Sequence, residues 1–141
     1  MNDRFRFRAW DKSFHKYCEN VIVSTINEKI TVYGRLVNGR TQLIPNSHVV
    51  LEQCIGLKDK NGRLIYEGDI LDFDLSIPKN GGHYRGIVYW QTQNNLIGWM
   101  ISSLKHTWSW DIMQIAHPND WMTWAVVIGN IHENPELLED K

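Results

Sequence analysis

Hydrophobic and polar positions alternate with a period of two over short stretches of this chain, and turn residues separate the stretches. Between residues 4 and 10, apolar side chains share one side and three arginines share the other. Residues 71–75 repeat the pattern with aspartates as the polar members. This period is typical of half-buried β-strands. Similar runs predict strands at residues 21–26, 30–33, 35–37, 40–44, 86–90, 96–102 and 123–128.

Turn residues between these runs predict hairpins. Asp59-Lys60-Asn61-Gly62 suits a type I turn, and Asn61-Gly62 alone would make a type I′ loop with the same topology. Asn38-Gly39 is the strongest hairpin signal in the chain. Residues 49–51 fit a strand or a helical turn, and residues 104–120 leave strand and helix both open. Asn134 as a cap and Pro135 in the first turn predict a short helix near the end.

These elements together predict a mainly β protein, all-β or β-rich α+β. Short strands at close spacing favour a small barrel or packed antiparallel sheets with a short C-terminal helix. The length of 141 residues suits one domain over residues 1–141.

Composition changes this picture mainly by exclusion. A formal net charge of −1 argues against nucleic-acid binding by bulk basicity, although a local basic patch remains compatible with it. No apolar run reaches the roughly 18 residues of a membrane span, and the first eight residues lack the apolar core of a secretory signal. Cys18 and Cys54 are isolated, which predicts free thiols in a cytosolic protein.

An acidic group is the first candidate for chemistry. Its carboxylates could hold Mg²⁺ or Mn²⁺, as a metal-dependent nuclease requires. The alternation of acids with apolar residues favours a solvated strand face instead. The six histidines have no metal-ligand spacing, and no serine has nucleophile-elbow glycines around it. We therefore assign no catalytic residue, metal ligand or cofactor. The acidic group consists of Glu67, Asp69, Asp72 and Asp74.

Three arginines near the N-terminus form a second candidate. Arg4, Arg6 and Arg8 share one strand face and could contact phosphates, while Trp10 could stack on a base. An edge strand kept soluble by charge would give the same pattern, with salt bridges to the acidic strand face as a variant.

Tryptophan is unusually frequent, with seven residues in the chain. Exposed aromatic side chains mark protein interfaces or stacking surfaces, so self-association is a reasonable expectation. The tryptophans within apolar runs, which we expect in the core, are Trp90, Trp99 and Trp124. The candidates for an interface are Trp108, Trp110 and Trp121.

Three motifs carry a family resemblance. They read FRAWDK at residues 7–12, GLKDKNG at 56–62 continued by IYEGDI at 65–70, and IGNI at 128–131 followed by ENPELL at 133–138. In this order they resemble the YopX family of bacteriophage and prophage proteins. Cys54-Ile55 departs from the aromatic-Thr pair expected before the central glycine, and residues 20–48 and 78–120 carry no matching motif.

The resemblance implies a mainly β fold and a life inside a bacterium that carries a phage. It brings no catalytic residue, so the matched positions are interpreted as structural. They are Trp10, Gly56, Asp59, Gly62, Tyr66, Glu67, Gly68, Asp69, Gly129, Asn130 and Asn134.

The sequence thus favours a non-enzymatic phage accessory protein in the cytoplasm of the bacterial host. We expect it to form a homo-oligomer and to bind a host or phage protein, or a nucleic acid. The alternative is a divalent-metal-dependent enzyme that acts on nucleic acid through Glu67, Asp69, Asp72 and Asp74. A minor structural component of the phage particle is a third hypothesis.

Overall fold

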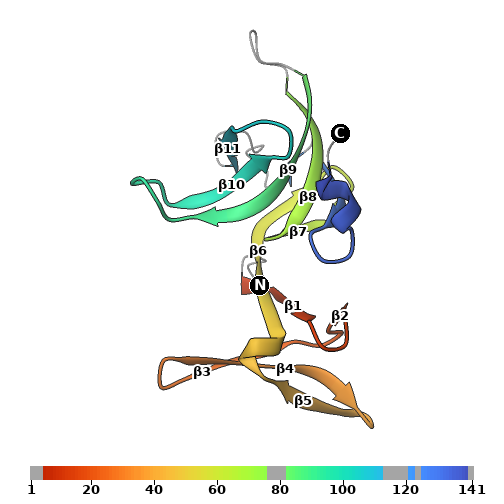
Figure 1. Cartoon of the computed structure of the whole chain (residues 1–141). Helices are drawn as coiled ribbons and strands as arrows, with labels where there is room; N and C mark the ends of the chain where they lie inside the picture. The colour runs from red at the N-terminus through yellow and green to blue at the C-terminus, as the bar shows by residue number, and fades with distance from the viewer. Residues whose placement is uncertain (1–4, 76–81, 113–120, 123–124, 140–141) are drawn as a thin grey trace. The chain divides into compact units, whose positions relative to one another are not determined.

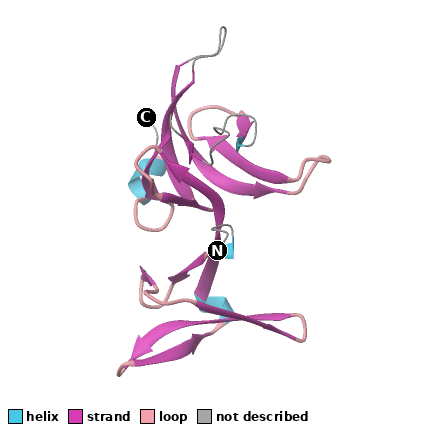
Figure 2. Cartoon of the chain, turned by 180° about the vertical axis from the view of Figure 1, so that it is seen from behind, coloured by secondary structure: helices cyan, strands magenta, loops and turns pink. Residues whose placement is uncertain are grey.

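Strands dominate the protein, for which a computed structural model describes residues 5–75, 82–112, 121–122 and 125–139 (Figures 1 and 2). The chain divides into two compact units, which we call the first unit, residues 6–53, and the second unit, residues 1–5 with 54–141. The single-domain expectation for residues 1–141 stays a prediction. No helix within the described ranges is long and apolar enough to cross a membrane.

The first unit consists of strands and one short 3₁₀ turn. β1 lies between β2 and the first half of β6, with antiparallel pairing on both sides. β4 lies between β3 and β5 in a second antiparallel sheet. The small core of the first unit consists of Ala9, Val32 and Ile44. The elements are β1 (Phe7–Asp11), β2 (Lys16–Tyr17), β3 (Ile22–Ile26), β4 (Lys29–Val37), β5 (Arg40–Ile44), η2 (Asn46–His48) and β6 (Val49–Asp59).

Asp11 is the polar anchor of the first unit. Its side chain is 1% exposed. Its Oδ1 accepts hydrogen bonds from the backbone N–H groups of Ser13 and Phe14, which closes the turn after β1. Arg35 donates to both carboxylate oxygens, at 2.7 Å from Nε and 2.9 Å from Nη2. The hydrogen bond from this guanidinium holds the pKa of Asp11 below its ordinary value.

The second unit contains a five-stranded antiparallel sheet in the order β11-β10-β9-β8-β13. β8, β9 and β10 curve strongly (Figure 1). The second half of β6 pairs with β7 in the antiparallel and β12 in the parallel sense. The elements are β7 (Leu64–Tyr66), β8 (Asp69–Leu75), β9 (Gly82–Gln91), β10 (Gly98–Ser103), β11 (Ser109–Asp111), β12 (Trp121–Met122), β13 (Ala125–Asn130) and η3 (Pro135–Leu138). The predicted mainly β fold class is confirmed, with antiparallel sheets and a short C-terminal 3₁₀ helix.

Alternation explains the core of this unit. Leu71 and Phe73 of β8 are at most 1% exposed, whereas Asp72 and Asp74 point to the other face. Val88 of β9 pairs across the sheet with Ile101 of β10, and both are buried. The buried cluster comprises Ile55, Leu57, Ile65, Leu71, Phe73, Val88, Ile101, Ile112, Ala125 and Val127.

Both hairpin signals are confirmed. Asn38 and Gly39 have φ values of 52° and 76°, as a two-residue type I′ loop requires between β4 and β5. Gly62 donates its N–H to the Asp59 carbonyl at 3.0 Å, which closes the turn between β6 and β7. Residues 49–51 begin β6, so the strand interpretation is correct there.

The core expectation for Trp90 was wrong. Phe5, which precedes β1, and Phe7 are 60% and 37% exposed, so Ala9 is the buried member of the apolar side predicted for residues 4–10. Trp90 is 45% exposed, because it lies near the end of β9, beyond the buried Val88. Trp99 is partly buried and packs on the core, as expected. Trp124 and residues 113–120 lie outside the described residues.

Candidate functional site

The Asp59 carboxylate connects the central motif to β13. Asp59 is 1% exposed. Its Oδ1 accepts the backbone N–H groups of Asn61 and Arg63 at 2.9 Å each, and its Oδ2 accepts the N–H of Val127 at 3.0 Å. One side chain therefore shapes the turn and fixes that turn to β13.

The Glu67-Gly68 turn makes a second connection. The Asp69 Oδ2 accepts the N–H of Tyr66 at 2.8 Å across this turn. Gly68 has a φ of 86°, which favours glycine over residues with a Cβ. Its N–H donates to the Val88 carbonyl, and its carbonyl accepts the N–H of Ile131. The turn is thus bound to both β9 and the segment after β13.

Asn130 organises the C-terminal turn. Its Oδ1 accepts the N–H groups of His132 and Glu133, and its Nδ2 donates to Glu133 Oε1 at 2.9 Å. The Asn130 N–H donates to Asn134 Oδ1 at 3.2 Å. A Cβ on Gly129 would lie 2.4 Å from that same Oδ1, so this close approach needs glycine. Asn134 precedes η3 but makes no side-chain cap, which corrects the capping expectation.

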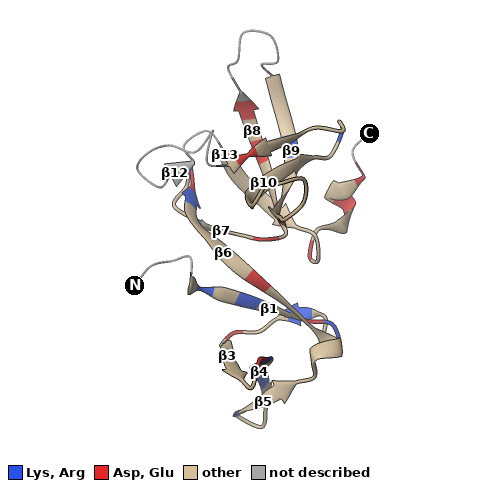
Figure 3. Cartoon of the chain, turned by 90° about the vertical axis from the view of Figure 1, so that its left-hand side faces the viewer, with Lys and Arg blue, Asp and Glu red and all other residues tan. Residues whose placement is uncertain are grey.

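The acids proposed as a metal site do not all converge. Asp69 is buried and holds the turn at Tyr66, whereas Asp72 and Asp74 lie on the solvent-facing side of β8. Figure 3 shows acidic positions along β8. Within the described ranges, no three His, Cys, Asp or Glu side chains are grouped so that they could hold a metal ion. No described geometry therefore carries the metal-enzyme alternative.

Of the three arginines near the N-terminus, Arg8 makes a structural ion pair. Arg8 Nε lies 3.0 Å from Glu52 Oε1, which also accepts the Tyr17 hydroxyl at 2.8 Å. Glu52 is 2% exposed, and burial raises the pKa of its carboxyl despite the Arg8 charge. Arg8 therefore pairs with β6 rather than with the acidic face of β8. Arg6 is exposed, and Arg4 lies outside the described residues.

The acids of β8 bind two basic residues of β9, which sequence reasoning missed. Asp72 is the cross-strand partner of Arg85, and Asp74 is the partner of His83. His83 Nε2 lies 2.7 Å from Asp72 Oδ1, and its Nδ1 lies 2.8 Å from Asp74 Oδ1. Arg85 Nε donates to Asp72 Oδ2 at 3.1 Å. Hydrogen bonding to Asp74, followed by Asp72, raises the pKa of His83 above its ordinary value.

We expect His83 to titrate above 6.5, the ordinary histidine value, because both ring nitrogens face carboxylates. A raised pKa means that this interaction stabilises the fold fully below pH 6.5 and is lost as the pH rises through the folded-state pKa. NMR titration of the ring protons measures that pKa. In Asp74→Asn it should fall toward 6.5, and an unchanged value in that variant would contradict the assigned cause.

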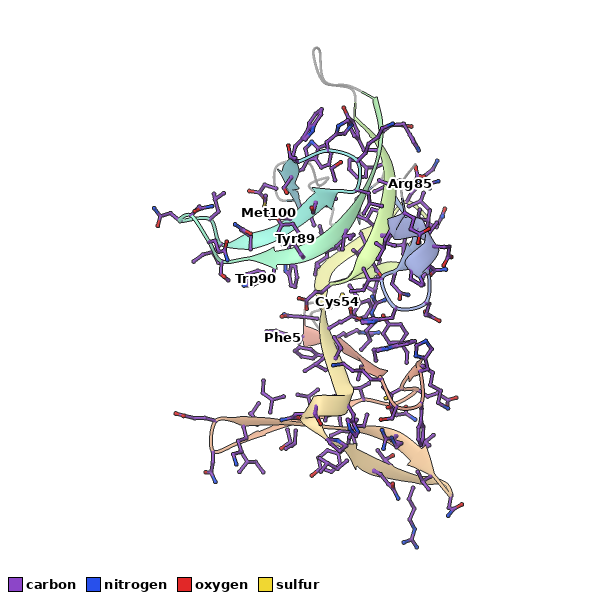
Figure 4. The ribbon with its side chains drawn as sticks, in the orientation of Figure 1. Phe5, Cys54, Arg85, Tyr89, Trp90 and Met100 are labelled. Carbon is purple, nitrogen blue, oxygen red and sulfur yellow. The ribbon has the colours of Figure 1, made fainter. Side chains whose placement is uncertain are left out.

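A polar hollow of about 240 Å³ lies beside this cluster. The loop that bounds it is fixed by the Ser103 hydroxyl, which accepts the N–H groups of Lys105 and His106, and by a bond from Leu104 N–H to the Arg85 carbonyl. Figure 4 shows Arg85 on β9. The lining residues are His83, Tyr84, Arg85, Ser103, Lys105 and His106.

Aromatic rings border the same hollow. Trp108 is 38% exposed, and its ring centroid lies 4.5 Å from that of His106 and 5.9 Å from that of Tyr84. Trp110 is half-buried, 5.3 Å from Phe73. Two of the interface candidates therefore differ in exposure: Trp108 is exposed, whereas Trp110 packs on the core. Trp121 begins β12, and its side chain is not described.

The end of the β9–β10 hairpin carries exposed apolar side chains. Leu96 and Ile97, between β9 and β10, are 55% and 78% exposed, and Trp90 near the end of β9 is also exposed. Trp90 pairs across the strands with Trp99, and their ring centroids lie 4.9 Å apart at 68°. Trp90 lies on the opposite side of the hairpin from the paired Tyr89 and Met100 (Figure 4). We call Trp90, Leu96, Ile97 and Trp99 the hairpin end.

Register is the information that the sequence pattern lacked. Alternation places Asp72 and Asp74 on one face, and a hairpin around residues 78–82 would have paired them with residues near 83–85. The predicted strand began at Gly86, whereas β9 begins at Gly82. The missed residues therefore lay just before the predicted strand.

The fold and these contacts define a class of protein. It is mainly β, and the side chains of Asp59, Asp69 and Asn130 in its motifs accept hydrogen bonds from its own backbone. A family model described as YopX protein matches residues 6–139. The chain therefore belongs to the YopX family.

Two solved structures are similar over nearly the whole chain. Protein EF1440 from Enterococcus faecalis has 28% identity and a TM-score of 0.59, covering 95% of this chain and 97% of that one. Protein yopX from Bacillus subtilis has 18% identity and a TM-score of 0.55, covering 99% and 100%. The latter likeness concerns the fold alone. The search of curated proteins found no match.

Proposed function

We propose that this chain is a phage- or prophage-encoded accessory protein that works as a non-enzymatic binding module in the cytoplasm of the bacterial host. In this proposal, copies of the chain associate through the hairpin end. The resemblance of the three motifs to bacteriophage and prophage proteins supports the phage part. The free thiols of Cys18 and Cys54 support the cytoplasmic part. The structural use of Asp59, Asp69 and Asn130 supports the non-enzymatic part.

The exposed hairpin end is the observation that carries the proposal. Apolar side chains that gather at one exposed end of a hairpin favour an interaction site, because burying them against a partner removes apolar area from water. The edge-to-face contact of Trp90 and Trp99 orders these two rings. A surface that is already ordered loses less entropy when it binds.

The open strand edge favours a second copy as the occupant. β8 pairs with β9 only as far as Ile87, and the Gly68 N–H then reaches the Val88 carbonyl. Beyond Val88, no strand among the described residues covers this edge of β9. An uncovered edge can add a strand from another chain, and an isologous contact would bring two hairpin ends together.

Light scattering tests the association. The wild type should be an oligomer at micromolar concentration, and Ile97→Asp should shift it toward the monomer because a charge cannot be buried there. Ile26→Asp is the matched control, since Ile26 is also an exposed isoleucine, at 67%. A monomeric wild type would refute self-association, and an Ile97→Asp protein of unchanged mass would refute the hairpin end.

A pull-down from phage-carrying host lysate, with and without nuclease, tests the wider function. We expect protein partners that survive nuclease treatment with the wild type. Their loss in Ile97→Asp but not in Ile26→Asp would place them at the hairpin end. Recovery that depends on intact nucleic acid in every variant would contradict a protein-binding module.

A further inference from the structure

We propose that the polar hollow between His83 and His106 binds a phosphodiester group of single-stranded nucleic acid, while the exposed Trp108 ring stacks on a base. This inference goes beyond the proposed function. It concerns the beginning of β9 and the end of β10, whereas the hairpin end lies at the opposite ends of the same two strands.

The lining supplies the groups that recognise a phosphate. Arg85 and Lys105 are permanent cations, and Ser103 adds a hydroxyl. Arginine, lysine and serine are the usual protein partners of phosphate oxygens. None of the six lining residues is acidic. Lys105 is exposed, and its backbone is fixed by the Ser103 hydroxyl.

The neighbouring acids set the charge of the site. Asp72 and Asp74 hold Arg85 and His83 from β8, and together they offset the charges of Arg85 and Lys105. Protonation of His83 then leaves the cluster with one net positive charge. His106 is the other imidazole of the lining. Binding of an anion should therefore tighten as the pH falls.

The size of the hollow indicates which part of a nucleotide can enter it. A volume of about 240 Å³ is smaller than the range of roughly 300–1,000 Å³ that holds drug-sized ligands. A phosphate with part of its sugar fits this space, but a whole nucleotide does not. The base must then lie outside the hollow, where Tyr84, His106 and Trp108 form a surface of aromatic rings.

The exposed ring favours a single strand over a duplex. Bases of a duplex are stacked on one another, whereas those of a single strand can stack on an aromatic side chain. Cations beside exposed rings are the arrangement that single-strand-binding proteins use. The net charge of −1 fits weak, local binding rather than bulk attraction.

Fluorescence anisotropy of the full chain with a labelled oligothymidylate of about twelve nucleotides, a length typical of single-strand sites, tests the proposal at low salt. We expect saturable binding that Trp108→Leu weakens about tenfold, as for the loss of one stacked base. Lys105→Glu should also weaken it and reduce the salt dependence by about one released counterion. Lys60→Glu, with the same charge change on an exposed turn, should bind as the wild type does.

Further arms separate ligand sources and pH effects. The same sequence as a duplex should bind more weakly, and inorganic phosphate should compete only at high concentration. Binding should be tighter at pH 6 than at pH 8, and His83→Gln should remove most of this difference. A melting curve of each variant confirms that it is folded.

The possible failures are distinct. Absence of binding, equal binding of the duplex, or equal losses in Lys60→Glu and Lys105→Glu would overturn the assignment. Ile97→Asp should leave oligonucleotide binding unchanged, so this test does not depend on the hairpin end.

Discussion

Asp59→Ala is expected to lower the free energy of unfolding by about 4 kcal/mol, because three backbone N–H groups lose their acceptor. The N–H of Val127 is the most costly, since that bond is buried and joins residues 68 positions apart. The loss is a large share of the roughly 5–15 kcal/mol that stabilises a typical domain. Urea unfolding monitored by tryptophan fluorescence measures it.

Asp59→Asn separates the two functions of this carboxylate. An amide oxygen can still accept from Asn61 and Arg63, but the amide nitrogen would face the Val127 N–H, donor against donor. We therefore expect Asp59→Asn to lower the free energy of unfolding, but by less than Asp59→Ala does. Asp74→Ala removes only an exposed, solvent-screened pair with His83, so it is the control and should lower stability much less than Asp59→Ala. Equal stability of Asp59→Ala and Asp74→Ala would contradict the account.

Local chemistry carried most of the strand and turn predictions. Asn38-Gly39 needs two positive φ values, and the alternation in β8 needs one buried face, so both can be inferred from neighbours in sequence. The Asp59 turn was predictable for the same reason. Its bond to Val127 was not, because no local pattern reports contacts between residues so far apart.

The candidate site also depends on contacts that no local sequence pattern reports. His83 and Arg85 become neighbours of Asp72 and Asp74 only through the register of β8 and β9. Apolar runs likewise predicted a core position for Trp90, but β9 extends past the core and exposes it. The ion pairs between β8 and β9 and the exposure of Trp90 therefore depend on strand register and strand length. Residue composition does not report either of these.

Asn130→Ala should lower the free energy of unfolding by about 3 kcal/mol, because the N–H groups of His132 and Glu133 lose their acceptor. The damage should concentrate after β13, where the Ile131 N–H binds the Gly68 carbonyl. Hydrogen exchange should thus show faster exchange at residues 131–134 and at the Glu67-Gly68 turn. Unchanged protection at both places would refute a role for the amide in holding this turn.

Asn130→Asp tests the donor half of the same amide. The new carboxylate can accept both N–H groups, but it places an oxygen where Nδ2 now donates to Glu133 Oε1. Two like charges in contact destabilise the turn at neutral pH, and protonation of the introduced carboxylate at low pH restores a donor. The difference in melting temperature from the wild type should therefore narrow as the pH falls from 7 to about 4. Asn94→Asp, which adds the same charge at an exposed turn, should show no such narrowing, because no carboxylate is bound there in the described hairpin.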